Sequence, residues 1–135
     1  MKLAPLFTSL RSNWRTPTEL YQQLDKEFHF DFDPCPPDPT FDGLSVEWQE
    51  SNFVNPPYGK ETIRWCEKAV EEWRKGKTVV MLLAARTDTK WFQDYCLPHA
   101  TEIRFIRGRL KFDDGKGSAP FPSCVVIFQT KTRRS

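Results

Sequence analysis

The chain has 135 residues, of which 39% are hydrophobic, so it is long enough for one packed core and too short for two ordinary domains. Its 20 Lys and Arg against 18 Asp and Glu leave a net charge of +2, which excludes neither nucleic acid nor an uncharged partner. The 11 Pro and 6 Gly predict many fixed turns and argue against a glycine-rich phosphate loop.

The longest apolar run, Val79 to Ala85, is far shorter than the roughly 18 residues that a membrane helix needs. Residues 1–10 lack the hydrophobic region and cleavage site of a secretory signal, so we expect a cytoplasmic protein. The four cysteines form no C-x-x-C pair, and neither histidine falls at zinc-site spacing from them. We therefore expect reduced, mostly buried thiols and no metal site; the cysteines are Cys35, Cys66, Cys96 and Cys124.

Residues 1–13 show no periodicity and are expected to form an N-terminal arm before a single domain over 14–130. The first clear helix signal runs from Pro17 to Phe28, with Thr16 as the capping residue and Glu19 completing a capping box. The alternation of Phe and Asp from Phe30 to Cys35 then predicts a short strand, which the following prolines terminate.

Downstream, strand and helix signals alternate and a hairpin comes last. Strands are predicted over 53–55, 78–85, 103–105, 110–112 and 124–128, and helices over 63–75 and 88–96, with a Gly/Pro loop at 113–122. The uninterrupted apolar strand from Thr78 to Ala85 indicates a sheet covered on both faces. This order predicts an α/β fold with a mixed sheet and an antiparallel C-terminal hairpin, followed by a basic tail over 131–135.

Asn55-Pro56-Pro57-Tyr58, hereafter the 55–58 motif, is the most specific feature of the chain. Two prolines after a strand fix the backbone, so the Asn55 amide oxygen and the Pro56 carbonyl can point as two acceptors at one place. An amino group on a planar base would donate both hydrogens there, and Tyr58 supplies a ring for that base to stack on. The plainer alternative is a proline-rich turn with a buried aromatic residue.

In this motif the chain resembles the amino-methyltransferases that use S-adenosylmethionine. Further segments make it similar to the small phage-type DNA N6-adenine methyltransferases, over about Trp14 to Phe128. These segments are Trp14-Arg15-Thr16-Pro17, Asp31-Phe32-Asp33-Pro34, Asp42-Gly43-Leu44 with Trp48, Phe53 to Gly59, Leu83 to Phe92, Gly108 to Phe112 and Ala119 to Ser123.

The resemblance implies a reduced Rossmann-like class I methyltransferase fold acting on DNA in a bacterial host cell, with S-adenosylmethionine as cofactor. It implies that Asn55, Pro56 and Tyr58 hold the target adenine and that Pro57 shapes the loop. The implied cofactor residues are Trp14, Thr16, Pro17, Asp33, Pro34 and Asp42. The chain departs from the wider superfamily after Asp33, where Cys35-Pro36-Pro37-Asp38 stands in place of glycines, so the cofactor loop cannot take the usual shape. For Asp33, a solvated carboxylate is an equally simple account, and for Thr16 and Pro17 a helix cap.

The expected DNA contacts are Lys60, Arg86, Lys90, Trp91, Arg109 and Lys111. Arg86 follows a buried strand, at the end of the sheet where α/β proteins bind ligands, although an ion pair with Asp88 explains it equally well. No separate target-recognition domain fits in this length, which favours a short recognition site or help from a second subunit in a homodimer. The alternatives are methylation of another amino group, such as guanine in RNA or glutamine in protein, and a non-catalytic DNA-binding protein on the same scaffold.

Overall fold

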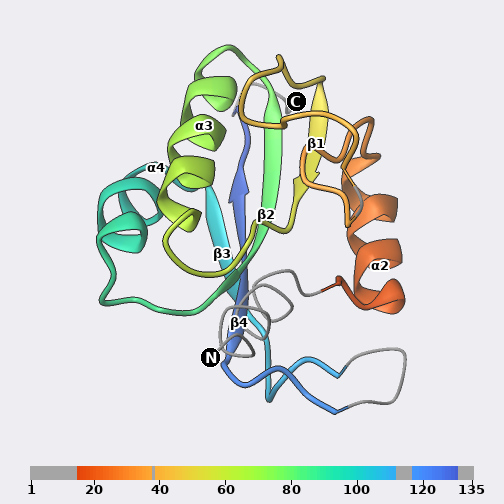
Figure 1. The fold of residues 1–135 in the computed structure, drawn as a ribbon, viewed down its shortest axis with the longest axis vertical. Helices are drawn as coiled ribbons and strands as arrows, with labels where there is room; N and C mark the ends of the chain where they lie inside the picture. The colour runs from red at the N-terminus through yellow and green to blue at the C-terminus, as the bar shows by residue number, and fades with distance from the viewer. Residues whose placement is uncertain (1–14, 38, 112–116, 131–135) are drawn as a thin grey trace, which may run out of the picture.

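The computed structural model describes residues 15–37, 39–111 and 117–130, and in this part of the chain helices cover both faces of one sheet (Figure 1). The elements in chain order are α2 (Thr18–Phe28), β1 (Ser51–Val54), α3 (Thr62–Arg74), β2 (Thr78–Ala84), the π-helix η1 (Phe92–Cys96), α4 (Leu97–His99), β3 (Glu102–Phe105) and β4 (Ser123–Phe128). The strands lie in the order β1-β2-β4-β3. β1 and β2 are parallel, whereas β4 is antiparallel to both of its neighbours.

The predicted α/β fold with a mixed sheet and a C-terminal antiparallel hairpin is therefore confirmed. The predicted arm at 1–13 and basic tail at 131–135 lie outside the described residues.

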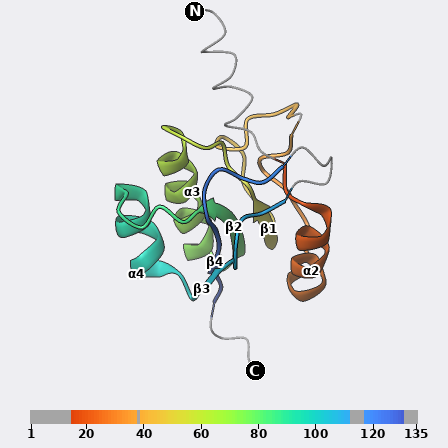
Figure 2. The same ribbon diagram turned by 90° about the horizontal axis from the view of Figure 1, so that it is seen from below.

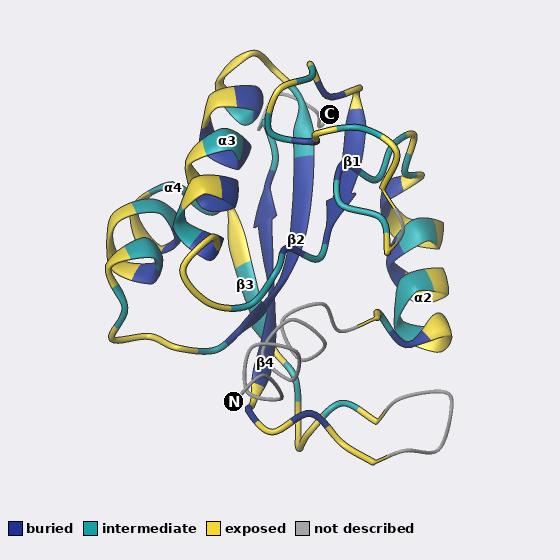
Figure 3. Ribbon diagram, in the orientation of Figure 1, coloured by how far each residue is buried: buried dark blue, intermediate teal, exposed yellow. Residues whose placement is uncertain are grey.

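The central strands are buried because each face of the sheet carries its own layer of helix. In β2, Val79, Met81 and Leu83 pack against α3 and η1, while Val80 and Leu82 pack against α2. Figure 2 shows α3 and α4 on one side of the sheet and α2 on the other. β1, β2 and β4 are buried, and the edge strand β3 is more exposed (Figure 3). Coverage on both faces explains why the chain has no polar residue between Val79 and Ala85.

The two long helices lie close to their predicted bounds. α2 buries Leu24 and Phe28 on one face, as the spacing indicated. α3 buries Trp65, Cys66 and Val70, and the chain leaves it through Gly76 at φ +100°, a conformation that favours glycine. None of the helices in the described ranges is long and apolar enough to cross a membrane.

The predicted cap of α2 is wrong. The helix starts at Thr18, one residue later than expected, and Pro17 stands at the N-cap position in an extended conformation with ψ 136°. No side chain of the described residues caps the first turn, so Thr16 and Glu19 do not form a capping box. The Thr16 hydroxyl instead accepts a hydrogen bond from Asn55.

Three other predicted elements are shorter or of a different kind. The predicted strand from Phe30 to Cys35 is a single parallel bridge, in which Phe32 pairs with Asn52 before the chain bends at Pro34. The strand expected over 110–112 is one antiparallel bridge between Lys111 and Ser118, and Phe112 lies outside the described residues. The helix expected over 88–96 turns into the π-helix η1 and continues through α4. Prolines limit the first segment, and hydrophobic periodicity alone does not distinguish a π-helix from an α-helix.

Two ion-pair clusters stabilise the described part of the fold, one at the end of α3 and one between α2 and β3. The Glu72 side chain of α3 is fully buried and forms ion pairs with Lys68, Lys75 and Lys77. On the opposite face, Arg104 of β3 forms two hydrogen bonds, of 2.8 and 2.7 Å, with the carboxylate of Glu27 in α2. The second cluster therefore links the edge strand to the helix above it.

Candidate active site

A pocket lies where β1 and β2 end and β4 begins. Because β1 and β2 are parallel, their carboxyl ends meet at the same edge of the sheet, next to the first residue of the antiparallel β4. Most of the lining side chains are apolar. The pocket is lined by Arg15, Asn55, Pro56, Tyr58, Thr62, Leu82, Leu83, Ala84, Trp91, Leu110, Ala119, Phe121 and Ser123. Three of the four residues of the 55–58 motif therefore line one pocket.

The 55–58 motif is held at both of its ends. The Asn55 side-chain nitrogen donates a 3.0 Å hydrogen bond to the Thr16 hydroxyl, which fixes the plane of the amide. At the other end, the Thr62 hydroxyl donates to the Pro57 carbonyl at 2.9 Å and accepts from the Gly59 N–H at 3.2 Å. Pro56 between them is buried. The motif is thus a rigid loop between β1 and the start of α3.

The Tyr58 ring contacts two side chains from other parts of the chain. Phe121 stacks on it with ring centroids 4.8 Å apart and an interplanar angle of 21°. The Arg86 guanidinium carbon lies over the same ring, 5.3 Å from its centroid. The alternative ion pair between Arg86 and Asp88 is absent from the described residues, so the contact with Tyr58 replaces it.

The predicted DNA-contact residues are close in sequence to residues that line the pocket. Trp91 lines it, Lys90 precedes Trp91, and Arg109 and Lys111 flank the lining residue Leu110. Lys60 comes two residues after Tyr58. The five basic residues of the set, Lys60, Arg86, Lys90, Arg109 and Lys111, are all exposed.

Those predicted cofactor residues that the structure describes are not among the residues that line this pocket. Asp33 stands at the end of the bridged segment beside β1, where it is partly buried, and burial raises the pKa of its carboxyl although the Cys35 N–H donates to it. Asp42 is exposed, and its two oxygens accept hydrogen bonds from the Leu44 N–H and the Ser45 hydroxyl.

The two cofactor segments nevertheless touch each other. A Cβ on Gly43 would lie 1.9 Å from the Pro34 carbonyl oxygen, so only glycine allows this approach. Thr16 reaches the 55–58 motif through Asn55, and Pro17 is buried. Trp14 lies outside the described residues.

The sequence did not single out several lining residues. In the sequence, Thr62 looks like an ordinary residue of the first turn of a helix. Arg15 belongs to the segment Trp14-Arg15-Thr16-Pro17, which supports the family resemblance, but the sequence predicts no role for it. Phe121 and Ser123 belong to the segment Ala119 to Ser123, which carried the resemblance without a role. Phe121 between two prolines was the available signal, because prolines fix the backbone that presents the ring. Across the described ranges, no group of three or more His, Cys, Asp or Glu side chains is arranged to hold a metal ion.

Comparisons with known proteins relate the chain to a protein family and to a phage protein. A model of the DNA N-6-adenine-methyltransferase (Dam) family matches residues 5–134, which include every pocket-lining residue. A DNA N-6-adenine-methyltransferase of Haemophilus phage HP1 (strain HP1c1) is 28% identical over 137 aligned positions, which cover 87% of this chain and 79% of the phage protein.

Proposed function

Since the chain belongs to the DNA N-6-adenine-methyltransferase (Dam) family and methylates the N6 amino group of adenine in DNA, we propose that it does so at the 55–58 motif with S-adenosylmethionine as methyl donor. We further propose that its mixed sheet is a reduced class I methyltransferase fold of the Rossmann type. The parallel pair β1 and β2, with the motif at its carboxyl end, supports this assignment, because open α/β sheets bind ligands at that edge.

In this proposal the target adenine leaves the DNA helix and enters the pocket. The Asn55 amide oxygen and the Pro56 carbonyl accept hydrogen bonds from its amino group and stabilise the positive charge that develops on the nitrogen. The amide plane that Thr16 fixes supports this role for Asn55, since the bond to Thr16 uses the amide nitrogen as donor. Tyr58 stacks on the base. No strongly basic side chain is needed, because the amino nitrogen attacks with its own electron pair and loses its extra proton to water after the methyl group has been transferred.

The residues around Asp33 fit the proposed methyl donor. S-adenosylmethionine supplies a methyl group on a positively charged sulfur when it is bound. Its ammonium group and ribose hydroxyls need acceptors, and Asp33 offers a carboxylate beside β1. The close packing of Pro34 on Gly43 brings the segments of Asp33 and Asp42 together, as one binding site requires. Asp33 is the better candidate of the two carboxylates, because it is partly buried and one of its oxygens accepts the hydrogen bond from its own turn, whereas Asp42 is exposed and both of its oxygens accept such bonds.

DNA would lie across the mouth of the pocket. Lys60, Arg86, Lys90, Arg109 and Lys111 are exposed and lie within two residues of a pocket-lining residue in the sequence, so in this proposal they contact phosphates. Trp91 lines the pocket itself, so it would contact the target nucleotide and not the backbone.

The observation that carries the proposal is the Asn55 amide, held by Thr16 at a pocket that Pro56 and Tyr58 also line. Asn55→Ala should abolish methylation while the dissociation constant for S-adenosylmethionine and the melting temperature stay unchanged. Methylation is measured by transfer of a labelled methyl group to DNA, and donor binding by calorimetry. Gln22→Ala, an exposed amide on α2, is the control and should behave as wild type. A loss of rate below about tenfold in Asn55→Ala, or about 1.4 kcal/mol, would exclude the assigned role.

A further inference from the structure

We propose that the Phe121 side chain occupies the position on Tyr58 that the target adenine takes, and that the incoming base displaces it. This inference rests on the function proposed above. The stacked arrangement of the two rings carries it, because centroids 4.8 Å apart leave no room for a third ring on that face of Tyr58. A base can stack there only after Phe121 has left.

The pocket shows which face of Tyr58 the base must use. Within the described ranges, Phe121 and Tyr58 both line the pocket, whereas Arg86, the other side chain over the Tyr58 ring, does not. Phe121 is 9% exposed and packs with Ala84 and Ala119 in a small cluster to which Tyr58 also belongs. The ring that meets a base entering the pocket is therefore Phe121.

The backbone around Phe121 is fixed, so the ring moves by rotation of its side chain. Pro120 and Pro122 flank it and restrict the backbone dihedral angles on both sides. The Ala119 N–H donates to the Leu110 carbonyl at 2.8 Å, and the Pro122 carbonyl accepts from the Ala85 N–H at 2.8 Å. These two hydrogen bonds anchor the loop immediately before and after the ring. Displacement therefore needs no rearrangement of the sheet.

The test compares binding of two DNA duplexes that differ only at the target position, once methylated sites have been mapped by sequencing. One duplex carries adenine and the other an abasic nucleotide. In Phe121→Ala the base no longer displaces a stacked ring, so the adenine duplex should bind about two- to tenfold more tightly than to wild type. The abasic duplex should bind equally to both proteins. Both affinities are measured by fluorescence anisotropy without methyl transfer.

Two further variants separate stacking from packing. Phe121→Leu keeps the apolar volume without a flat face and should tighten adenine binding as Phe121→Ala does. Phe121→Trp presents a larger ring to Tyr58 and should weaken it. Phe105→Ala removes a phenylalanine that is 64% exposed on β3 and is the matched control, with wild-type affinities for both duplexes. Weaker binding of the adenine duplex in Phe121→Ala and Phe121→Leu would show that Phe121 stays in place and packs against the bound adenine. That result would overturn the proposal. Unchanged binding would overturn it as well.

Failure of this inference is distinguishable from failure of the proposed site. If the site is wrong, Asn55→Ala stays active and Tyr58→Ala leaves the ratio of the two affinities at the wild-type value. If only the inference about Phe121 is wrong, Asn55→Ala is inactive and Tyr58→Ala weakens binding of the adenine duplex, while Phe121→Ala does not strengthen it.

Discussion

Thr16 illustrates how one side chain can have two explanations that only its contacts separate. The sequence Thr-Pro before a helix predicts a cap, and the structure places the Thr16 hydroxyl on Asn55 instead. The residue therefore acts on the orientation of a proposed catalytic side chain and not on the start of α2. A sequence pattern shows that a residue type suits a local role such as capping. It does not show that a residue distant in the sequence binds the same side chain instead.

Thr16→Val should lower the rate of methylation about two- to tenfold, because it removes one hydrogen bond worth about 0.5–1.5 kcal/mol. The melting temperature should change little, because the lost hydrogen bond joins two partly buried side chains and no side chain of the described residues caps α2. Thr16→Ser keeps the hydroxyl and should restore the rate. Single-turnover rates and thermal unfolding of the three proteins check this. A loss of about 1 kcal/mol in stability with a normal rate would instead support the capping role.

At the scale of elements, regular patterns predicted the fold and short or bent segments did not. α2, α3, β2 and β4 all have a strong apolar face or run, and each lies within a few residues of its predicted bounds. The segment from Phe30 to Cys35 has the alternation of a strand, but the bend at Pro34 leaves only the bridge at Phe32. The 55–58 motif was visible because its residue types are rare together. Thr62 and Phe121, which hold or cover it, are common residues whose role depends on contacts across the fold.

The segment around Leu110 provides the next prediction. Arg109 and Lys111 are exposed on either side of this lining residue, so replacing both by Ala should weaken binding to DNA of any sequence. The slope of the logarithm of affinity against the logarithm of salt concentration should fall by about one unit for each phosphate that the double variant no longer neutralises. Titrations at several salt concentrations measure both effects.

The matched control is Lys26→Ala together with Arg74→Ala, two exposed basic residues in the last turns of α2 and α3. It changes the net charge by the same amount. An equal loss of affinity and slope in both double variants would mean that net charge, and not this segment, determines binding.

At the scale of the whole molecule, the buried Glu72 cluster connects stability to pH. Burial alone would raise the pKa of Glu72, but hydrogen bonds from Lys77, Lys68 and Lys75 outweigh it and lower the pKa from 4.5 to about 2. A lowered pKa means that the ionised carboxylate stabilises the folded state. Its contribution is complete above pH 4.5 and is lost as the pH falls towards 2, and it is on the order of 3 kcal/mol.

Glu72→Gln should therefore lower the free energy of unfolding at pH 7 by about that amount, on the order of 3 kcal/mol. The difference from wild type should shrink at pH 3, where part of the contribution is already lost. Urea unfolding at the two pH values tests this. Glu71→Gln, the exposed neighbour, should differ little from wild type at either pH. A deficit of the same size at both pH values would contradict the ionisation account.

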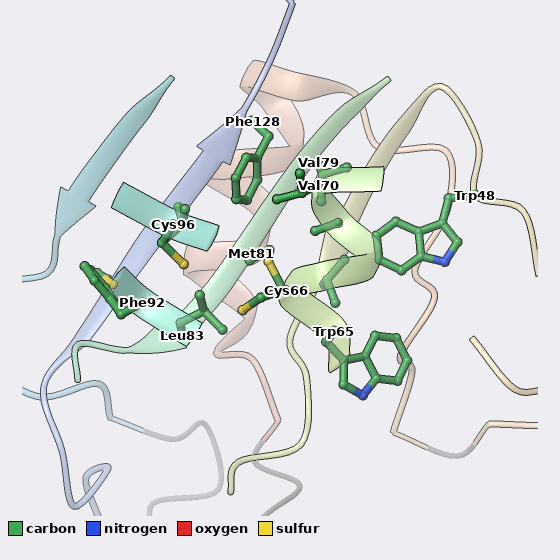
Figure 4. Packing of buried hydrophobic residues seen from close by; sticks show 14 residues of the cluster. Trp48, Trp65, Cys66, Val70, Val79, Met81, Leu83, Phe92, Cys96 and Phe128 are labelled. Atoms are coloured by element: carbon green, nitrogen blue, oxygen red, sulfur yellow. The ribbon is translucent and has the colours of Figure 1, made fainter. Parts of the chain in front are cut away.

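The three buried cysteines of the core allow the opening of this protein to be measured in solution. Cys66, Cys96 and Cys124 come from α3, η1 and β4, and all three are buried in the cluster shown in part in Figure 4. A hydrogen bond with Cys96 and burial raise the pKa of Cys66, and burial raises that of Cys124 to about 12, so neither forms a reactive thiolate near neutral pH. A thiol reagent can reach the three sulfurs only when helices and sheet separate. The rate at which all three thiols become alkylated together, measured by mass spectrometry, would therefore report the rate at which the whole domain opens.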